Sequence, residues 1–278
     1  GVAGALVLEE IAAVCGGMAT AIGANWLAQT PLLIAATPEQ RQRFLAPLAS
    51  PDGRLACFAM TEPSGGSDIE NPAMHSRTIR TIARPTGDGF LINGTKRFPS
   101  NAGIAYLYTV VASVDPQSGD HGSCILVVPA DTPGLSFGKP ENKMGMRADR
   151  NCDIIFEDVR VSQDHLLGQI GDGARLLQTT LAYNRAGAGA ISVGMARGAF
   201  QIALEYARHR TQGGMPLSEQ PVVSSMLADM ATDIDAARLL VWRATWYNAT
   251  HRPPGLRYAS MAKVFASDMA MRVISHAI

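Results

Sequence analysis

The chain has 278 residues, of which 47% are hydrophobic and 17% are charged, and 24 basic residues balance 24 acidic ones. This is the composition of a globular protein with one large or two modest cores, and a net charge of zero gives no indication of a nucleic-acid partner or of an anionic membrane surface. The four cysteines lie far apart, with no C-x-x-C pair and no histidine at zinc-ligand spacing. They predict neither a disulfide framework nor a metal site, and they favour a reducing compartment such as the cytoplasm.

The first 50 residues are predicted to be helical. Residues 1–26 are rich in Ala, Gly and Val, but Glu9 and Glu10 lie within the run, no basic segment precedes it, and the first residue is Gly. We therefore expect a buried helix of small residues rather than a membrane span or a signal sequence, in a chain that begins partway into a longer protein. Thr37 is the predicted N-cap of a second helix that begins at Pro38, and residues 1–50 form a partial N-terminal helical domain.

Residues 51–165 change character and are predicted to form a β domain. Strand-like runs cover residues 106–114, 124–128 and 153–161, and Asn93-Gly94 between two further runs predicts a β-hairpin. Helices of normal length do not alternate with these strands in the sequence. We therefore expect an antiparallel barrel or sandwich instead of a doubly wound parallel sheet.

Residues 166–278 return to helical periodicity. Long helices are predicted over residues 174–210, 220–250 and 258–278, with a break at His251-Arg252-Pro253-Pro254-Gly255. Such helices with short connections are typical of an up-and-down bundle. Together with the N-terminal helices and the β domain, this bundle predicts a multi-domain α+β fold. Because three helices that stop at Ile278 leave an apolar face open, we expect more chain or another subunit to complete the bundle.

Glycine patterns separate packing from ligand binding. Gly187-Ala188-Gly189 lies within a predicted helix and no strand precedes it, so it predicts close helix packing rather than a dinucleotide site, and the same holds for Gly194 and Gly198. The turn Thr61–Asp68, read TEPSGGSD, follows a strand instead. Its exposed amides and hydroxyls suit a ligand with carbonyl and phosphate oxygens.

The turn resembles the T-E-P-x-x-G-S-D signature of FAD-dependent acyl-CoA dehydrogenases. Four further blocks resemble this family in the same order and at its spacing, and together they cover nearly the whole chain. These blocks are Asn93–Asn101, Asn142–Arg147, Phe156–Val161, and Arg210 with Gln220 and Leu227–Met230.

The resemblance implies an activity, a cofactor and partners. It implies that FAD takes a hydride from the β-carbon of an acyl-CoA or acyl-carrier thioester while a carboxylate removes the α-proton, which gives a trans-2-enoyl thioester. Electron-transfer flavoprotein is the implied oxidant, and a homodimer or homotetramer is the implied assembly. The implied location is the cytoplasm, or the mitochondrial matrix in a eukaryote.

The resemblance also assigns residues to the two ligands. Thr61 is expected to bond the polar edge of the flavin, Phe98 to form a wall of its site, and Arg210 to meet the FAD pyrophosphate or adenosine of a neighbouring subunit. The other expected cofactor residues are Phe58, Met60, Gly66, Ser67, Ser100 and Gln220. The expected substrate residues are Ser67, Tyr183, Asn184 and Arg185.

No residue of the sequence is assigned as the catalytic base. Asn184 occupies the position at which some branched-chain relatives carry Glu, and an amide is no general base near neutral pH. Asp149 and Glu205 have no supporting context, and Glu62 is expected to be structural. Two alternatives stay open beside the dehydrogenase, namely a non-catalytic FAD-binding or partner subunit, and an oxidase or flavin monooxygenase on the same fold. Gly213, where relatives carry an aromatic residue, favours the first alternative.

Overall fold

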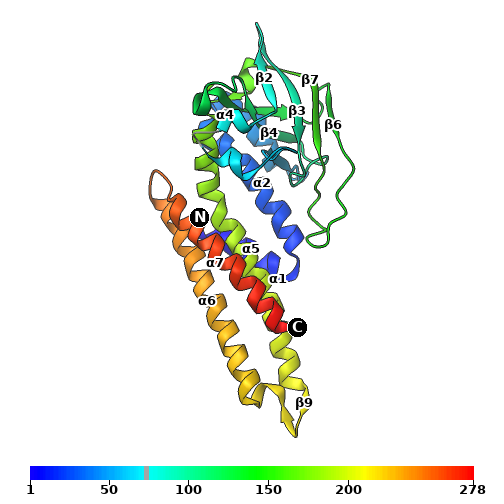
Figure 1. Cartoon of the computed structure of the whole chain (residues 1–278), viewed down its shortest axis with the longest axis vertical. Helices are drawn as coiled ribbons and strands as arrows, with labels where there is room; N and C mark the ends of the chain where they lie inside the picture. The colour runs from blue at the N-terminus through cyan, green and yellow to red at the C-terminus, as the bar shows by residue number, and fades with distance from the viewer. Residues whose placement is uncertain (72–74) are drawn as a thin grey trace. The chain divides into compact units, whose positions relative to one another are not determined.

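The computed structural model describes residues 1–71 and 75–278 (Figure 1). The chain divides into two compact units, a helical one of Gly1–Gly23 with Ala182–Ile278 and a β-sheet one of Ala24–Leu181. Helices α2 (Gly16–Ala35) and α5 (Gly173–His209) contribute residues to both units. Among the described helices, none combines the length and the hydropathy that a membrane crossing needs.

The helical unit confirms the long C-terminal helices expected from the sequence. α6 begins at Pro221, where the absent N–H of proline costs nothing, and α7 follows the Pro253-Pro254-Gly255 break. The two helices pack along each other. A short hairpin connects α5 with α6. The elements of this unit are α1 (Val2–Val14), the second half of α5, β9 (Thr211–Gln212), β10 (Met215–Pro216), α6 (Pro221–Thr250) and α7 (Leu256–Ala277).

Small residues let α1 approach α5 closely, as the glycine pattern predicts. A methyl group on Gly194 would lie 2.3 Å from the Glu9 carbonyl oxygen, and one on Gly198 would lie 2.2 Å from the Ala13 carbonyl oxygen. The buried Glu9 carboxylate pairs with Arg197 at 3.5 Å and with Arg238 at 2.9 Å. The α1 backbone therefore rests directly on α5, and charged side chains hold α1 to α6 as well.

The β-sheet unit contains one mixed sheet. Its strand order is β6-β7-β3-β2-β4-β5-β8, and β1 adds to β4. Most pairs are antiparallel, as the sequence predicts, but β1 and β2 each run parallel to β4. The strands are β1 (Ala56–Ala59), β2 (Ile82–Pro85), β3 (Gly89–Lys96), β4 (Leu107–Ser113), β5 (Ser123–Pro129), β6 (Leu135–Phe137), β7 (Ile154–Ser162) and β8 (Leu166–Leu167).

The prediction of a hairpin at Asn93-Gly94 is wrong. These residues lie inside β3, where the pairing with β7 shifts register between Ile92 and Gly94. The Asn93 side chain bonds the backbone and the carboxylate of Asp158 across the bulge, at 2.9 and 3.0 Å. Gly94 has φ +144° and passes so close to Thr81 that a methyl group would lie 2.7 Å from its Cα. The dipeptide thus serves a β-bulge, which needs the same backbone freedom as a tight turn.

The central strands β4 and β5 are buried on both faces, whereas β7 alternates between buried and exposed residues. Strand β4 alternates between two core clusters, with Leu107 and Val111 in one and Tyr108 and Val110 in the other. The first cluster includes side chains of α2 and of the start of α5, such as Leu32 and Leu177. This burial on both sides explains why β4 reads as a continuous apolar run.

The segment after α2 confirms the predicted cap at Thr37. The Thr37 hydroxyl accepts from the Gln40 amide while the Gln40 side chain accepts from the Thr37 amide, which is a complete capping box. Gln40 also donates to the carbonyl oxygens of Asp164 and Leu166 at 2.9 and 2.8 Å. The short helix α3 (Pro38–Gln40) is therefore anchored to the end of the β-sheet.

Candidate functional site

The Gly-rich turn leaves the sheet at the end of β1 and carries several backbone N–H groups. The Glu62 and Gly65 amides bond each other's carbonyl oxygens at 2.9 and 3.2 Å, which closes the turn. A 3₁₀ segment, Ser67–Glu70, follows. The amides of Gly66, Ser67 and Asp68 donate to no residue that the structure describes. Three adjacent N–H donors and the exposed Ser67 hydroxyl are suited to an oxygen-rich ligand.

Thr61 lies beside the segment that carries Phe98. The Arg97 amide donates to the Thr61 carbonyl oxygen at 2.7 Å, which joins the end of β1 to the end of β3. The half-buried Thr61 hydroxyl bonds no described residue, and Gly66 packs on the Thr61 side chain without a Cβ. Phe98 has φ +39° and is 48% exposed. A positive φ is energetically unfavourable for a bulky residue, and an exposed ring gains no packing that would compensate for it. A role in contacting a ligand would explain why Phe98 adopts this conformation.

A buried ion pair between Lys96 and Glu62 anchors the turn to the sheet. The Lys96 ammonium lies 2.7 Å from the Glu62 carboxylate and 3.0 Å from the Met60 carbonyl oxygen. The same carboxylate accepts from the amides of Arg80 and Thr81 at 2.6 and 2.9 Å. Burial lowers the pKa of Lys96 to about 8, although the neighbouring Glu62 carboxylate acts to raise it. Burial also acts to raise the pKa of Glu62, but Lys96 and the hydrogen bonds hold it below its usual value. The expectation that Glu62 is structural agrees with this geometry.

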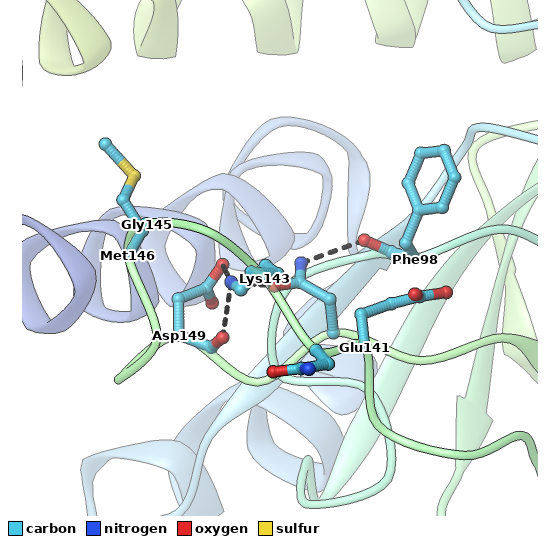
Figure 2. Close-up of a pocket in the computed structure, with 8 residues that line it drawn as sticks. Phe98, Glu141, Lys143, Gly145, Met146 and Asp149 are labelled. Atoms are coloured by element: carbon cyan, nitrogen blue, oxygen red, sulfur yellow. Dashed lines mark hydrogen bonds and ion pairs between the residues drawn. The ribbon is translucent and has the colours of Figure 1, made fainter.

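A pocket of ≈ 530 Å³ lies next to Phe98, in the loop between β6 and β7 (Figure 2). Ser100 adjoins it, because its hydroxyl donates to the Asp149 carboxylate at 2.8 Å. Asp149 is 4% exposed and is paired with Lys143 at 3.2 Å. The lining residues are Phe98, Glu141, Asn142, Lys143, Gly145, Met146, Asp149 and Asn151. An aromatic wall with several polar groups is the arrangement expected of a small-molecule site.

The side chains of Phe58 and Met60 turn toward the interior of the β-sheet unit. Phe58 is 7% exposed and belongs to the core cluster that includes Leu32 and Leu177, and the partly buried Met60 packs against the same cluster. Little of the Phe58 residue is therefore accessible to a ligand. The turn offers mainly backbone atoms and hydroxyls.

Arg210 and Gln220 lie together at the hairpin of the helical unit. The exposed Arg210 guanidinium donates to the Gln212 side chain at 3.3 Å, and the Gln220 amide donates to the Gln212 carbonyl oxygen at 2.8 Å. Gly213, with φ +66°, begins the turn between β9 and β10. The two predicted cofactor residues, which are distant from each other in the sequence, thus share one short surface segment.

Tyr183, Asn184 and Arg185 lie on α5 within the helical unit and are all half-buried. Arg185 donates to the Ser260 hydroxyl of α7 at 3.0 Å, and the Arg252 guanidinium lies 5.7 Å from the centre of the Tyr183 ring. Arg185 therefore contributes to helix packing. This position is compatible with the expectation that it is structural or lies near the thioester.

The sequence reading missed the polar cluster under Phe98 and Ser100. Asp149 had no recognisable context because its partners Lys143 and Ser100 are brought to it by the folding of the loop and by the end of β3. The motif that contains Lys143 was the only available signal. Glu205 instead forms an exposed pair with His209. Among the described residues, no group of three His, Cys, Asp or Glu side chains is arranged to hold a metal ion.

Comparison with known proteins gives one consistent family. Three family models match, namely the N-terminal domain of acyl-CoA dehydrogenase at residues 2–52, its middle domain at residues 57–159 and its C-terminal domain at residues 171–278. A cyclohex-1-ene-1-carbonyl-CoA dehydrogenase of Geobacter metallireducens is 38% identical over 274 residues, which cover 99% of this chain and 70% of that protein. The chain spans 64% of the length of another such relative, from Syntrophus aciditrophicus.

Solved structures agree with this result. A chain in the structure of the electron transferring flavoprotein of Acidaminococcus fermentans is 37% identical with a TM-score of 0.92, and the match covers 98% of this chain and 70% of that one. The prolyl acyl carrier protein oxidase AnaB is 30% identical with a TM-score of 0.90, and the match covers 98% and 71%.

Proposed function

Because this chain belongs to the acyl-CoA dehydrogenase family, we propose that it binds FAD and acts in the α,β-dehydrogenation of an acyl thioester, from acyl-CoA to trans-2-enoyl-CoA. The observation that carries the proposal is the junction of Thr61 with Phe98, held by the bond from the Arg97 amide to the Thr61 carbonyl oxygen. FAD, when bound, would supply the hydride acceptor. The residues of this chain would bind and orient it.

The groups at this junction fit an isoalloxazine ring. The Thr61 hydroxyl, which bonds no residue in the described part of the chain, can bond a polar ring edge, and the exposed Phe98 ring can pack against a planar surface. Ser100 supplies a second hydroxyl two residues after Phe98. Phe58 and Met60, which precede the turn, would meet the cofactor only with the small part of each residue that the core cluster leaves accessible. The amides of Gly66 and of Ser67, which is assigned to both cofactor and substrate, can bond carbonyl or phosphate oxygens.

The remaining assignments belong to the helical unit. Arg210 and Gln220 would bind the pyrophosphate or adenosine part of an FAD held by a neighbouring subunit, in a homodimer or homotetramer. Their proximity at one hairpin supports a shared ligand. Tyr183, Asn184 and Arg185 would line the substrate side. The proposal assigns no catalytic base among these residues, and it places the protein in the cytoplasm or, in a eukaryote, in the mitochondrial matrix.

Two observations bear on the oxidant. The likeness to a chain in an electron transferring flavoprotein structure supports an electron-transfer flavoprotein as the oxidant. The likeness to AnaB favours a second candidate function, an oxidase that passes electrons to oxygen and takes its acyl group on a carrier protein. A non-catalytic FAD-binding or partner subunit is the third candidate, and Gly213 and Asn184, which stand where relatives carry an aromatic residue and a Glu, favour it.

The test begins with the purified protein and its absorbance spectrum. Bound FAD is expected, and anaerobic addition of acyl-CoA thioesters should bleach the flavin absorbance. A protein without FAD affinity would contradict the proposal. Bound FAD that no thioester reduces would favour the non-catalytic subunit, and peroxide formed in air during turnover would favour the oxidase.

Variants connect the result to the proposed site. Thr61→Ala and Phe98→Ala should each weaken FAD binding by about tenfold, as expected for one lost hydrogen bond or packing surface. Met144→Ala is the control, because Met144 is fully exposed and lies in the loop between β6 and β7 without lining the pocket. Equal FAD affinity in all three variants would place the flavin elsewhere.

A further inference from the structure

The loop between β6 and β7 is tied to the Phe98–Ser100 segment by several polar contacts. The Asn151 side-chain amide donates to the Phe98 carbonyl oxygen at 2.9 Å, and Ser100 and Asn151 also form an isolated β-bridge. The Ser100 hydroxyl donates to Asp149 at 2.8 Å. Asp149 and Asn151 also line the pocket. Their hydrogen bonds therefore fix the positions of Phe98 and Ser100 at its edge.

Lys143 is the centre of this network (Figure 2). Its ammonium group donates to the Asp149 carbonyl oxygen at 2.5 Å, to the Asp149 carboxylate at 3.2 Å and to the Asn151 side-chain oxygen. These three acceptors use all the hydrogens of the ammonium group. The Lys143 side chain is 24% exposed and that of Asp149 is 4% exposed, so the pair is largely shielded from water.

Without Lys143, the Asp149 carboxylate would be buried with no counter-ion among the residues that the structure describes. One of its oxygens, Oδ1, is already buried without a hydrogen-bond partner among the described residues. A buried carboxylate that loses its counter-ion either takes up a proton or moves toward water. Either change would release the Ser100 hydroxyl, and Asn151 would lose its orientation at the same time.

The network also decides the hydrogen-bonding role of Ser100. An ionised carboxylate only accepts hydrogen bonds, so the Ser100 hydroxyl hydrogen is committed to Asp149. The Asn151 side-chain amide donates to the Ser100 hydroxyl oxygen at 3.4 Å. Toward any further group, Ser100 therefore offers a lone pair rather than a proton.

We propose that Lys143 is a positioning residue that, through Asp149 and Asn151, holds Ser100 as a hydrogen-bond acceptor and Phe98 as an aromatic wall for the flavin ring. The inference rests on the proposed function, which assigns both residues to FAD. Reduction by two electrons adds N–H donors to the isoalloxazine ring. A hydroxyl that can only accept then stabilises the reduced ring more than the oxidised one and raises its reduction potential.

The test compares Lys143→Met with Lys139→Met, a control in the same loop that removes an exposed lysine. The dissociation constant of FAD is measured by reconstitution of the flavin-free protein, and the potential by equilibration with a reference dye. Lys143→Met should bind FAD about tenfold more weakly and show a more negative potential, since one hydrogen-bonded orientation is lost. Lys139→Met should match the parent in both quantities.

Asp149→Asn provides a second variant of nearly the same shape, for the case in which Lys143→Met does not fold. Its amide can donate to Ser100, which frees the hydroxyl hydrogen, so the potential should again become more negative. Unchanged affinity and potential in the variants, with FAD bound by the parent protein, would overturn this inference and leave the proposed function intact. Lower affinity at an unchanged potential would overturn the acceptor role of Ser100. A parent protein that binds no FAD would overturn both proposals.

Discussion

The Lys96 ammonium lies 2.7 Å from the Glu62 carboxylate, and both side chains are completely buried. The pair joins the end of β3 to the turn that follows β1, and Lys96 also bonds the Met60 carbonyl oxygen. Glu62 in turn accepts from the two amides that precede β2. Three segments that are distant in the sequence thus meet at one ion pair, next to Thr61 in the chain.

Lys96→Met should lower the free energy of unfolding by about 3–5 kcal/mol, because it leaves the Glu62 carboxylate buried without its cation. The double variant Lys96→Met/Glu62→Gln should be more stable than Lys96→Met alone, since the remaining charge is removed while one acceptor for the Arg80 and Thr81 amides stays. Urea denaturation measures all three proteins.

A surface pair supplies the control for this cycle. Glu205 and His209 form an exposed pair on α5, and Glu205→Gln should change the unfolding free energy by no more than about 0.5 kcal/mol. A double variant less stable than Lys96→Met would contradict the view that the unpaired charge causes the loss.

His165 makes the stability of the β-sheet unit depend on pH. Its Nδ1 lies 2.7 Å from the Val127 carbonyl oxygen, and the Arg43 guanidinium donates to its Nε2 at 3.1 Å. This arrangement requires the neutral imidazole with its proton on Nδ1. Burial, together with Arg43, lowers the pKa of His165 below the ordinary 6.5, although the Val127 carbonyl and Asp164 oppose the shift.

The sign of the pH effect follows from this direction. Below about pH 6.5 the unfolded chain takes up a proton at His165 that the folded chain refuses, so the free energy of unfolding falls as the pH falls, by at most about 1.4 kcal/mol per pH unit. Denaturation at pH 7.5 and 5.5 should show a smaller loss in His165→Asn than in the parent. His209→Asn, at an exposed histidine, should keep the parental loss, and equal losses in all three proteins would rule out His165 as the source.

Periodicity and turn chemistry predicted most of the helices because these are local properties. The capping box at Thr37 and the proline at the start of α6 are both readable from neighbouring residues. Asn93-Gly94 was misread for the same reason. A β-bulge and a two-residue turn need the same backbone freedom, and only the close approach of Thr81 and Asp158, distant in the sequence, distinguishes them.

In the candidate site, too, the residues within local motifs could be predicted and their tertiary partners could not. Thr61, Phe98 and Ser100 could be named because each lies in a short motif. The partners that orient them could not, because Lys143 and Asp149 reach Ser100 only after the loop between β6 and β7 has folded against β3. The parallel pairing of β1 and β2 with β4 also escaped prediction, since strand order depends on long-range packing.

Gly194 provides a test of the close packing between α1 and α5. At an open helix position, Gly→Ala stabilises a protein by up to about 1 kcal/mol, but here the new methyl group would lie 2.3 Å from the Glu9 carbonyl oxygen. Gly194→Ala should therefore destabilise the chain by about 1–3 kcal/mol, because a backbone atom cannot move aside as a flexible side chain can. Thermal unfolding measures the change. Gly87→Ala, with no atom within 4 Å of the added group, should leave the midpoint unchanged or slightly raised. An unchanged midpoint for Gly194→Ala would mean that α1 can separate from α5 at little cost.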